Sequence, residues 1–326
     1  MSSIQRRTLL AAAAGSLVVT SPSAWAAYPD KPIKLIVPWA PGGSTDAIAR
    51  ALAQRMSETM GQSVIVDNRA GAAGQIGTDA LAKSAPDGYT LGIVELPHAI
   101  APAVVAKLPY DLLRDFSPIT LIGTSPLVLF TGVGPENADF KTFLRNAKAA
   151  AQPPAIAHSG SGTVSHLVGE LFAARSKVNF NLVPYRGSAP ALIDVASGQV
   201  AAHFATLASG AALMAAGKIR ALAITTNRRV DAPVLRAVPK LPELGFGDLI
   251  VNQWWALVAP ATTPLPLLDR LRLDTIGALS SPNVLSRMAT LGVDLKGSTR
   301  DELRTFMRSE SERWQLVAKS IGLKPQ

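Results

Sequence analysis

The chain has 326 residues, of which 48% are apolar and 17% are charged, and its formal net charge at pH 7 is +9. This composition is typical of a folded protein of about two domains or lobes, and it excludes disordered and collagen-like chains. Cysteine is absent, which excludes a disulfide framework, a thiolate metal site and a cysteine nucleophile.

The first 26 residues have the pattern of an export signal. Arg6 and Arg7 precede an apolar run over residues 9–19 that is too short to span a bilayer, and small residues end the segment at Ala26. We therefore predict a signal peptide over residues 1–26, cleaved near Ala26. The paired arginines resemble a twin-arginine signal, and an ordinary Sec signal is the alternative.

Apolar runs rich in β-branched residues alternate with amphipathic segments at the start of the mature chain. One helix is predicted from Ser44, because Ile48, Leu52 and Met56 share one face, and Gly61 is expected to end it. The expected strands cover residues 33–39, 63–66 and 89–94, and a second helix covers 71–83. Such alternation predicts a parallel sheet of the α/β class.

Two consecutive strands, at residues 119–122 and 127–131, interrupt this alternation before it resumes. We then expect helices at 140–150 and from 163, and strands at 155–158, 182–185, 200–204, 220–225 and 254–259. The tail is predicted to be helical over 266–279, 282–291 and 299–321 and to return to the first lobe. Residues 195–217 and 249–268 lack charge, but polar residues and prolines within them argue against membrane-embedded segments.

Two glycine-rich turns between a strand and a helix are candidate anion sites. A helix N-terminus offers unpaired N–H groups and a partial positive charge, and glycine allows a ligand to approach the backbone. We expect a carboxylate or phosphate to bind there, with help from the hydroxyls of Ser44, Thr45, Ser161 and Thr163. The first loop is Trp39-Ala40-Pro41-Gly42-Gly43-Ser44-Thr45-Asp46, and the second loop is His158-Ser159-Gly160-Ser161-Gly162-Thr163.

Other interpretations of these residues are less well supported. The second loop lacks the third glycine of a dinucleotide-binding fingerprint, and no nucleophile elbow occurs in the chain. Asp46 could act as a general base, but an acid in a first helical turn more often complements the helix dipole. His158 and His166 are poorly spaced for shared zinc ligation. Basic residues do not cluster with aromatic ones, so nucleic acid is not an expected partner.

Ordered motifs run through nearly the whole mature chain, and together they resemble one family, the receptors of tripartite tricarboxylate transporters, or Bug receptors. The motifs are Val37-Pro38-Trp39-Ala40-Pro41-Gly42-Gly43, Val66-Asp67-Asn68-Arg69, Ala85-Pro86-Asp87-Gly88-Tyr89, Leu108-Pro109-Tyr110-Asp111, Gly160-Ser161-Gly162-Thr163, Val183-Pro184-Tyr185-Arg186-Gly187, Gly198-Gln199-Val200 and Pro242-Glu243-Leu244-Gly245.

The resemblance implies a type II periplasmic binding protein, in which two α/β lobes are joined by two crossing strands and a ligand cleft lies between them. We place lobe 1 at residues 27–125 and 253–326 and lobe 2 at residues 126–252. The implied function is capture of a small carboxylate by lobe closure, for delivery to integral-membrane transporter subunits. The implied ligand is a di- or tricarboxylate or an aromatic acid, and no enzyme activity, metal or cofactor is implied.

The family pattern also implies that both loops hold one ligand carboxylate, and that Trp39 either walls the pocket or packs in the core. Three residues depart from the pattern. His158 stands where a small Ser is common, and Ala205 stands where an Asp is frequent, which disfavours an amino-acid ligand. Glu95 replaces small polar residues after the third strand. If it faces the cleft it would bond a hydroxyl or amine or repel a second carboxylate, and otherwise it would point to solvent.

Two other functions are compatible with the same residues. A carboxylate-sensing receptor for a signalling partner would use the same fold and ligand site. An exported hydrolase would need a nucleophile–base pair, and the sequence provides no clear one. We expect a monomer, because a hinge requires free lobes.

Overall fold

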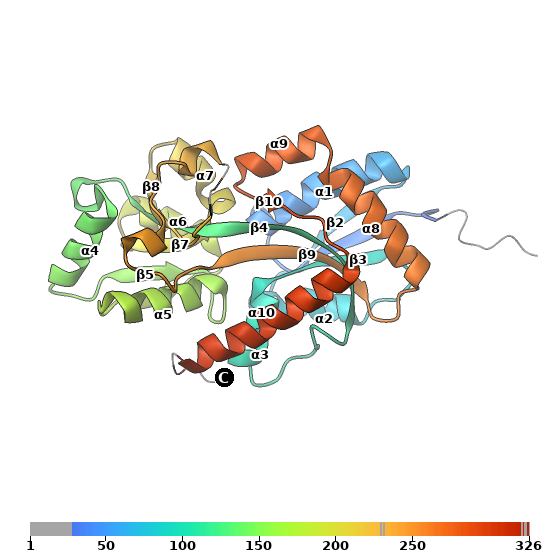
Figure 1. Ribbon diagram of the computed structural model, residues 1–326, viewed down its shortest axis with the longest axis horizontal. Helices are drawn as coiled ribbons and strands as arrows, with labels where there is room; N and C mark the ends of the chain where they lie inside the picture. Colours follow the sequence, from blue (N-terminus) through green and yellow to red (C-terminus); the bar gives the residue numbers. More distant parts are fainter. Residues whose placement is uncertain (1–27, 229, 231, 321, 323–324, 326) are drawn as a thin grey trace, which may run out of the picture.

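The computed structural model describes residues 28–228, 230, 232–320, 322 and 325. The predicted signal peptide, residues 1–26, lies outside the described residues. The molecule has two lobes side by side, and two long strands run from one lobe to the other (Figure 1).

Lobe 1 begins with three parallel strands in which β1 lies between β2 and β3. Its elements are β1 (Ile33–Val37), α1 (Ser44–Met60), β2 (Val64–Asn68), a 3₁₀ turn (Ala72–Gly74), α2 (Gln75–Ala82), β3 (Thr90–Glu95) and α3 (Leu96–Val104). The predicted apolar face of α1 is buried, and Gly61 ends the helix in the left-handed conformation, with φ 70°. The predicted first helix is therefore confirmed.

The strand β4 (Phe116–Gly132) is continuous and joins the two lobes. It pairs antiparallel with β9 (Asn252–Pro260) as far as Pro126, and with β7 and β8 from Leu127 onward. The prediction of two separate strands here was wrong. Pro126 interrupts the sequence pattern, but it lies where β4 changes partners and a missing N–H is tolerated.

Lobe 2 repeats the strand–helix alternation on the other side of β4. Its elements are α4 (Phe140–Ala149), β5 (Ala155–His158), α5 (Val164–Ser176), β6 (Asn181–Pro184), α6 (Ser188–Ser197), β7 (Ala202–Thr206), α7 (Leu207–Ala215) and β8 (Ile219–Ile224). Short 3₁₀ turns occupy Pro135–Asn137, Pro233–Leu235 and Leu241–Leu244. The strand β5 is parallel to both β6 and β7. The predicted lobe bounds themselves stay a prediction.

The tail returns to lobe 1, as the sequence predicted. It consists of α8 (Leu265–Leu279), α9 (Pro282–Thr290), β10 (Asp294–Leu295) and α10 (Arg300–Ser320). The helix α8 packs on α1, and α10 packs on α3 and β4 (Figure 1). One core cluster runs through both lobes and includes Phe172 of α5 and Trp254 of β9.

Within the described part of the chain, no helix combines the length and the apolar character needed to cross a membrane. The two charge-free segments fold into ordinary elements of the lobes. The first contains β7 and α7, and the second contains β9.

Candidate functional site

The first loop connects β1 to the N-terminus of α1. Gly43 occupies the N-cap position in an extended conformation, and no side chain caps the helix. The backbone N–H groups of Ser44, Thr45 and Asp46 find no acceptor among the described residues. This helix end therefore keeps the unpaired donors and partial positive charge that an anion site requires.

Asp46 fixes the shape of the first loop from within. Its carboxylate accepts hydrogen bonds from the N–H of Gly42 at 3.0 Å, from Arg50 Nε at 2.9 Å and from Asn68 Nδ2 at 3.0 Å. Asn68 also donates to the carbonyl of Trp39, at 3.1 Å. Burial would raise the pKa of Asp46, but these hydrogen bonds outweigh it and lower the pKa. A carboxylate so occupied serves the loop and the helix dipole rather than acting as a base.

Glu95 lies behind the first loop and does not point to solvent, since it is 2% exposed. Its Oε2 accepts a hydrogen bond from Thr45 Oγ1 at 2.9 Å and another from Gln253 Nε2 of β9. Trp255 Nε1 donates to the same Thr45 oxygen at 3.0 Å. Burial raises the pKa of Glu95 to about 8, against hydrogen bonds that lower it. The single proton of the Thr45 hydroxyl is therefore used inside the protein.

A buried histidine, which the sequence did not single out, extends this network. His98 Nδ1 accepts from the N–H of Glu95 at 3.0 Å, and its Nε2 lies 2.8 Å from Thr78 Oγ1. Burial lowers the pKa of His98 to about 4, so its ring is neutral. Thr78 donates to the carbonyl of Gly74, which lies against the ring of Trp39. The network thus supports both ends of the first loop.

Trp39 packs at the edge of the core, which is one of the two roles that the sequence suggested. The side chain is partly buried and packs against the core cluster of lobe 1. Its Nε1 is buried and finds no acceptor among the described residues. Ala40 and Gly42, which follow it, are exposed, and Gly43 is partly exposed.

The second loop connects β5 to the N-terminus of α5 and is held by uncharged groups. Thr163 is the N-cap, and its hydroxyl donates to the carbonyl of Gly160 at 2.7 Å. The N–H of Ser159 donates to Ser165 Oγ at 2.9 Å, and the N–H of Gly162 donates to His166 Nδ1 at 3.3 Å. First-turn N–H groups of α5 again find no acceptor in the described residues. The hydroxyls of Ser44 and Ser161, unlike those of Thr45 and Thr163, make no hydrogen bond to a described residue.

His158 lies at the base of the second loop and is 3% exposed. Its ring centre is 4.5 Å from that of His166. Burial is the main cause that lowers the pKa of both rings, so both are neutral near pH 7. Within the described residues, no group of three or more His, Asp or Glu side chains is placed to hold a metal ion.

The helix α3, which the sequence did not predict, links the two loops. Glu95 at its start bonds Thr45 of the first loop, and Val104 at its end packs on Gly162, where an added Cβ would lie 2.8 Å from Val104. Nine helical residues span about 13 Å. No hydrogen bond or ion pair joins the loops directly among described side chains.

Ala205 is 3% exposed in β7 and belongs to a core cluster of lobe 2.

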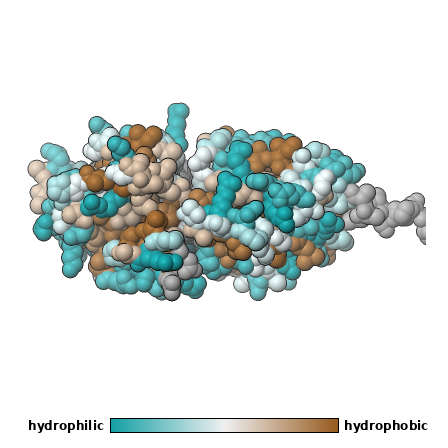
Figure 2. All heavy atoms as spheres, turned by 90° about the horizontal axis from the view of Figure 1, so that it is seen from above, coloured by the Kyte–Doolittle hydropathy of each residue, from teal (hydrophilic) through white to brown (hydrophobic). Residues whose placement is uncertain are grey.

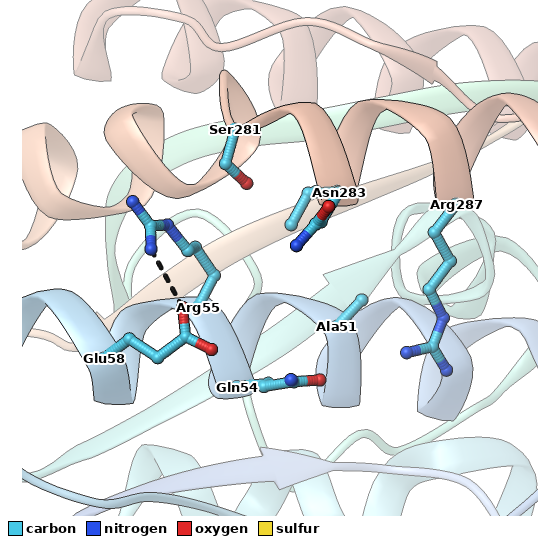
Figure 3. Close-up of a pocket in the computed structure, with 8 residues that line it drawn as sticks. Ala51, Gln54, Arg55, Glu58, Ser281, Asn283 and Arg287 are labelled. Carbon is cyan, nitrogen blue, oxygen red and sulfur yellow. Dashed lines mark hydrogen bonds and ion pairs between the residues drawn. The ribbon is translucent and has the colours of Figure 1, made fainter.

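A separate hollow lies between later turns of α1 and the start of α9 (Figure 3). Arg55 pairs with Glu58 along α1 at 2.8 Å, and Arg287 extends toward α1 from α9. No residue of either loop lines this hollow.

Seen from above, apolar and hydrophilic residues are interspersed over both halves of the surface (Figure 2).

Two α/β lobes joined by long strands are the architecture of the type II periplasmic binding protein fold. A model of the family described as "Tripartite tricarboxylate transporter family receptor" matches residues 48–323. The chain belongs to this family.

Relatives match nearly the whole length of the chain. The protein BugT of Bordetella pertussis is 37% identical over 309 residues, which cover 94% of each chain. A Rhodopseudomonas palustris protein solved with adipate is 31% identical, has a TM-score of 0.87, and is matched over 92% of this chain and all of that one. A second protein from that organism, MatC, solved with bound malate, is 30% identical with a TM-score of 0.81 and is matched over 89% and 99%.

Proposed function

We propose that the mature protein is a periplasmic receptor that captures a small carboxylate between its lobes and delivers it to a tripartite tricarboxylate-type membrane transporter. The observation that carries the proposal is the pair of helix N-termini, one in each lobe, with N–H groups that have no acceptor among the described residues. Relatives solved with adipate and malate support an acidic ligand. The family description supports the transporter partner.

The ligand carboxylate lies on the backbone N–H groups of both loops in this proposal. Ser44 and Ser161 are the hydroxyls that remain free to donate to it, and Trp39 Nε1 is a third unused donor. Four other residues do not contact the ligand in this proposal but hold the loops in shape: Thr45, Thr163, Asp46 and Glu95. Neutral donors suit this task because they add no counter-ion that must be desolvated.

Binding proceeds by closure of the lobes about the two connecting segments. β4 changes partners after Pro126, and the chain leaves lobe 2 just after Val251, whose N–H bonds the carbonyl of Thr225. Closure brings the two helix N-termini onto one ligand, and the closed form is the species that the transporter subunits recognise. Capture needs no bond cleavage, and the family description of a receptor supports binding rather than catalysis.

The test is to identify small molecules released from denatured mature protein by mass spectrometry, followed by thermal unfolding of the stripped protein against malate, adipate, citrate and benzoate. A ligand at 100 times its Kd should stabilise the native state by about 2.7 kcal/mol, an easily measured shift. Binding of neutral or cationic solutes in place of every acid would overturn the proposal.

The matched variants are Gly43→Asp and Gly247→Asp. Both glycines are at least partly exposed, and an added Cβ meets no atom closer than 4.0 Å at either position. Only the first places a carboxylate in the first loop. Loss of the acid-dependent shift in Gly43→Asp alone is the expected result.

A further inference from the structure

The carboxylate of Glu95 and the proposed ligand site share one helix end. Glu95 Oε2 is held by Thr45, which lies in the first turn of α1, and by Gln253, the second residue of β9. Glu95 is 2% exposed, and no described cation forms an ion pair with it. The first loop therefore has a buried acid directly behind the N–H groups that face the proposed ligand.

The side chains around Glu95 either do not titrate or keep one charge state near neutral pH. From α3, the neutral His98 ring accepts a hydrogen bond from the backbone N–H of Glu95. From α1, Asp46 follows Thr45 in the chain, and its charge is balanced by Arg50 at 2.9 Å. The β9 neighbours, Gln253 and Trp255, do not titrate. Burial raises the pKa of Glu95 to about 8, which places its titration close to neutral pH.

The hydrogen-bond network accommodates both charge states of Glu95. Trp255 donates to Thr45 Oγ1, so the Thr45 proton is directed to Glu95, as an ionised acceptor requires. Gln253 Oε1, by contrast, is buried and has no partner among the described residues. A half-turn of the Gln253 amide would present this oxygen to a protonated Glu95 and satisfy its O–H.

We propose that capture of an anionic carboxylate by the first loop is coupled to uptake of one proton by Glu95. The inference rests on the proposed function. Two carboxylates at one helix N-terminus repel each other, and protonation of the buried one removes that repulsion. The ligand stays ionised, one solvent proton forms an O–H bond on Glu95, and no other bond is made or broken.

The experiment is isothermal titration calorimetry of the mature protein with malate, adipate, citrate and benzoate. Titrations run at about pH 8 to 9, where free carboxylic acids are ionised, in pairs of buffers with different ionisation enthalpies. The wild-type protein should take up as much as one proton per bound acid, and its affinity should fall by as much as about tenfold per pH unit as pH rises above about 8. Glu95→Gln should bind without proton uptake and with an affinity independent of pH.

The matched control is Glu310→Gln. Glu310 is also a buried carboxylate, and it accepts from tryptophan N–H groups, but it lies on α10 and forms no hydrogen bond or ion pair with the first loop among the described residues. This variant should keep the proton uptake of the wild type. The wild-type titration alone tests the coupling, so the proposal does not depend on the folding of any variant.

Three results would overturn the inference. Tight binding by the wild type without proton uptake, or uptake that persists in Glu95→Gln, removes Glu95 from the coupling but leaves the receptor function intact. Persisting uptake would show that a group other than Glu95 takes up the proton. Failure of all four acids to bind at any pH would overturn the receptor proposal as well.

Discussion

The two loops have the same local design, but only the first is braced by acidic side chains. Each follows a strand, contains glycines and ends in a helix whose first N–H groups are open. The first loop is braced by two carboxylates, Asp46 and Glu95, whereas the second is braced by Thr163, Ser165 and the neutral ring of His166. A shared sequence pattern therefore does not determine how much positive potential a helix end offers to a ligand.

The difference suggests that anion binding depends on protonation in lobe 1 and not in lobe 2. In the first loop, the dipole of α1 already stabilises the ionised Asp46, and the buried Glu95 becomes charged as it titrates, so a further anion there is sensitive to protonation. In the second loop the dipole is uncompensated within the described contacts. Substitutions in the two loops should therefore differ in size of effect and in pH dependence.

The largest effect is expected for Gly43→Asp, which places a third carboxylate at the N-terminus of α1. We expect affinity for the acid identified by mass spectrometry to fall by about 100-fold or more, or roughly 2.7 kcal/mol, with little change in thermal stability. Titration calorimetry and thermal unfolding measure the two quantities.

Ser161→Asp tests the second loop at an exposed residue; retained affinity there would deny that loop a role. Gly160 is less suitable, because its φ of 127° strains any other residue.

Glu95 should make stability depend on pH in an unusual direction. Its folded pKa, about 8, lies above the ordinary value of 4.5, so its stabilising contribution is complete below about 4.5 and is lost as pH rises through 8. Relative to Glu95→Gln, the wild type should lose on the order of a few kcal/mol of unfolding free energy across that range. Urea denaturation at several pH values measures it, and parallel curves for the two proteins would contradict the expectation.

Asp46 should show the opposite dependence. Its pKa is lowered, so the stability it contributes is present near neutral pH and is lost as pH falls through the folded pKa. Asp46→Asn should cost about 1–2 kcal/mol at neutral pH, because charge-assisted hydrogen bonds to the first loop are lost. The cost should shrink in acid. Urea denaturation of both proteins tests this, and a cost that grows in acid would refute it.

The smallest effect is expected in the second loop. Ser165→Ala removes an acceptor for the N–H of Ser159 and should cost about 1 kcal/mol. The cost should not vary with pH, because no carboxylate is involved in this bond. A pH-dependent cost would show that titrating groups also brace the second loop.

Most elements could be predicted because their signals are local. The face of α1 is set by residues four apart, and its end by one glycine, so both were correct in position. The helices α3, α6 and α7 were missed because they are short and largely apolar, and they contain proline or glycine, so no polar face marks a period. The continuity of β4 was missed because a proline such as Pro126 indicates the end of a strand in sequence. Only the pairing of β4 with its neighbours shows that the strand continues.

The candidate loops were also accessible from sequence, because a glycine turn before a helix start is a local pattern. Their environment was not. Thr45 meets Glu95 across 50 residues and Trp255 across 210, and Glu95 meets Gln253 across 158. No neighbouring residue indicates such a contact, so whether Glu95 faced a ligand, solvent or the interior was open.

The sequence by itself thus determined the α/β class, the family, and two turns suited to an anion, because periodicity and turn chemistry depend on near neighbours. Only the tertiary structure decided which hydroxyls stay free, how each loop is braced, and that a buried acid lies behind the first loop. Burial and long-range hydrogen bonds decide charge state and donor direction, and both arise when distant segments pack together.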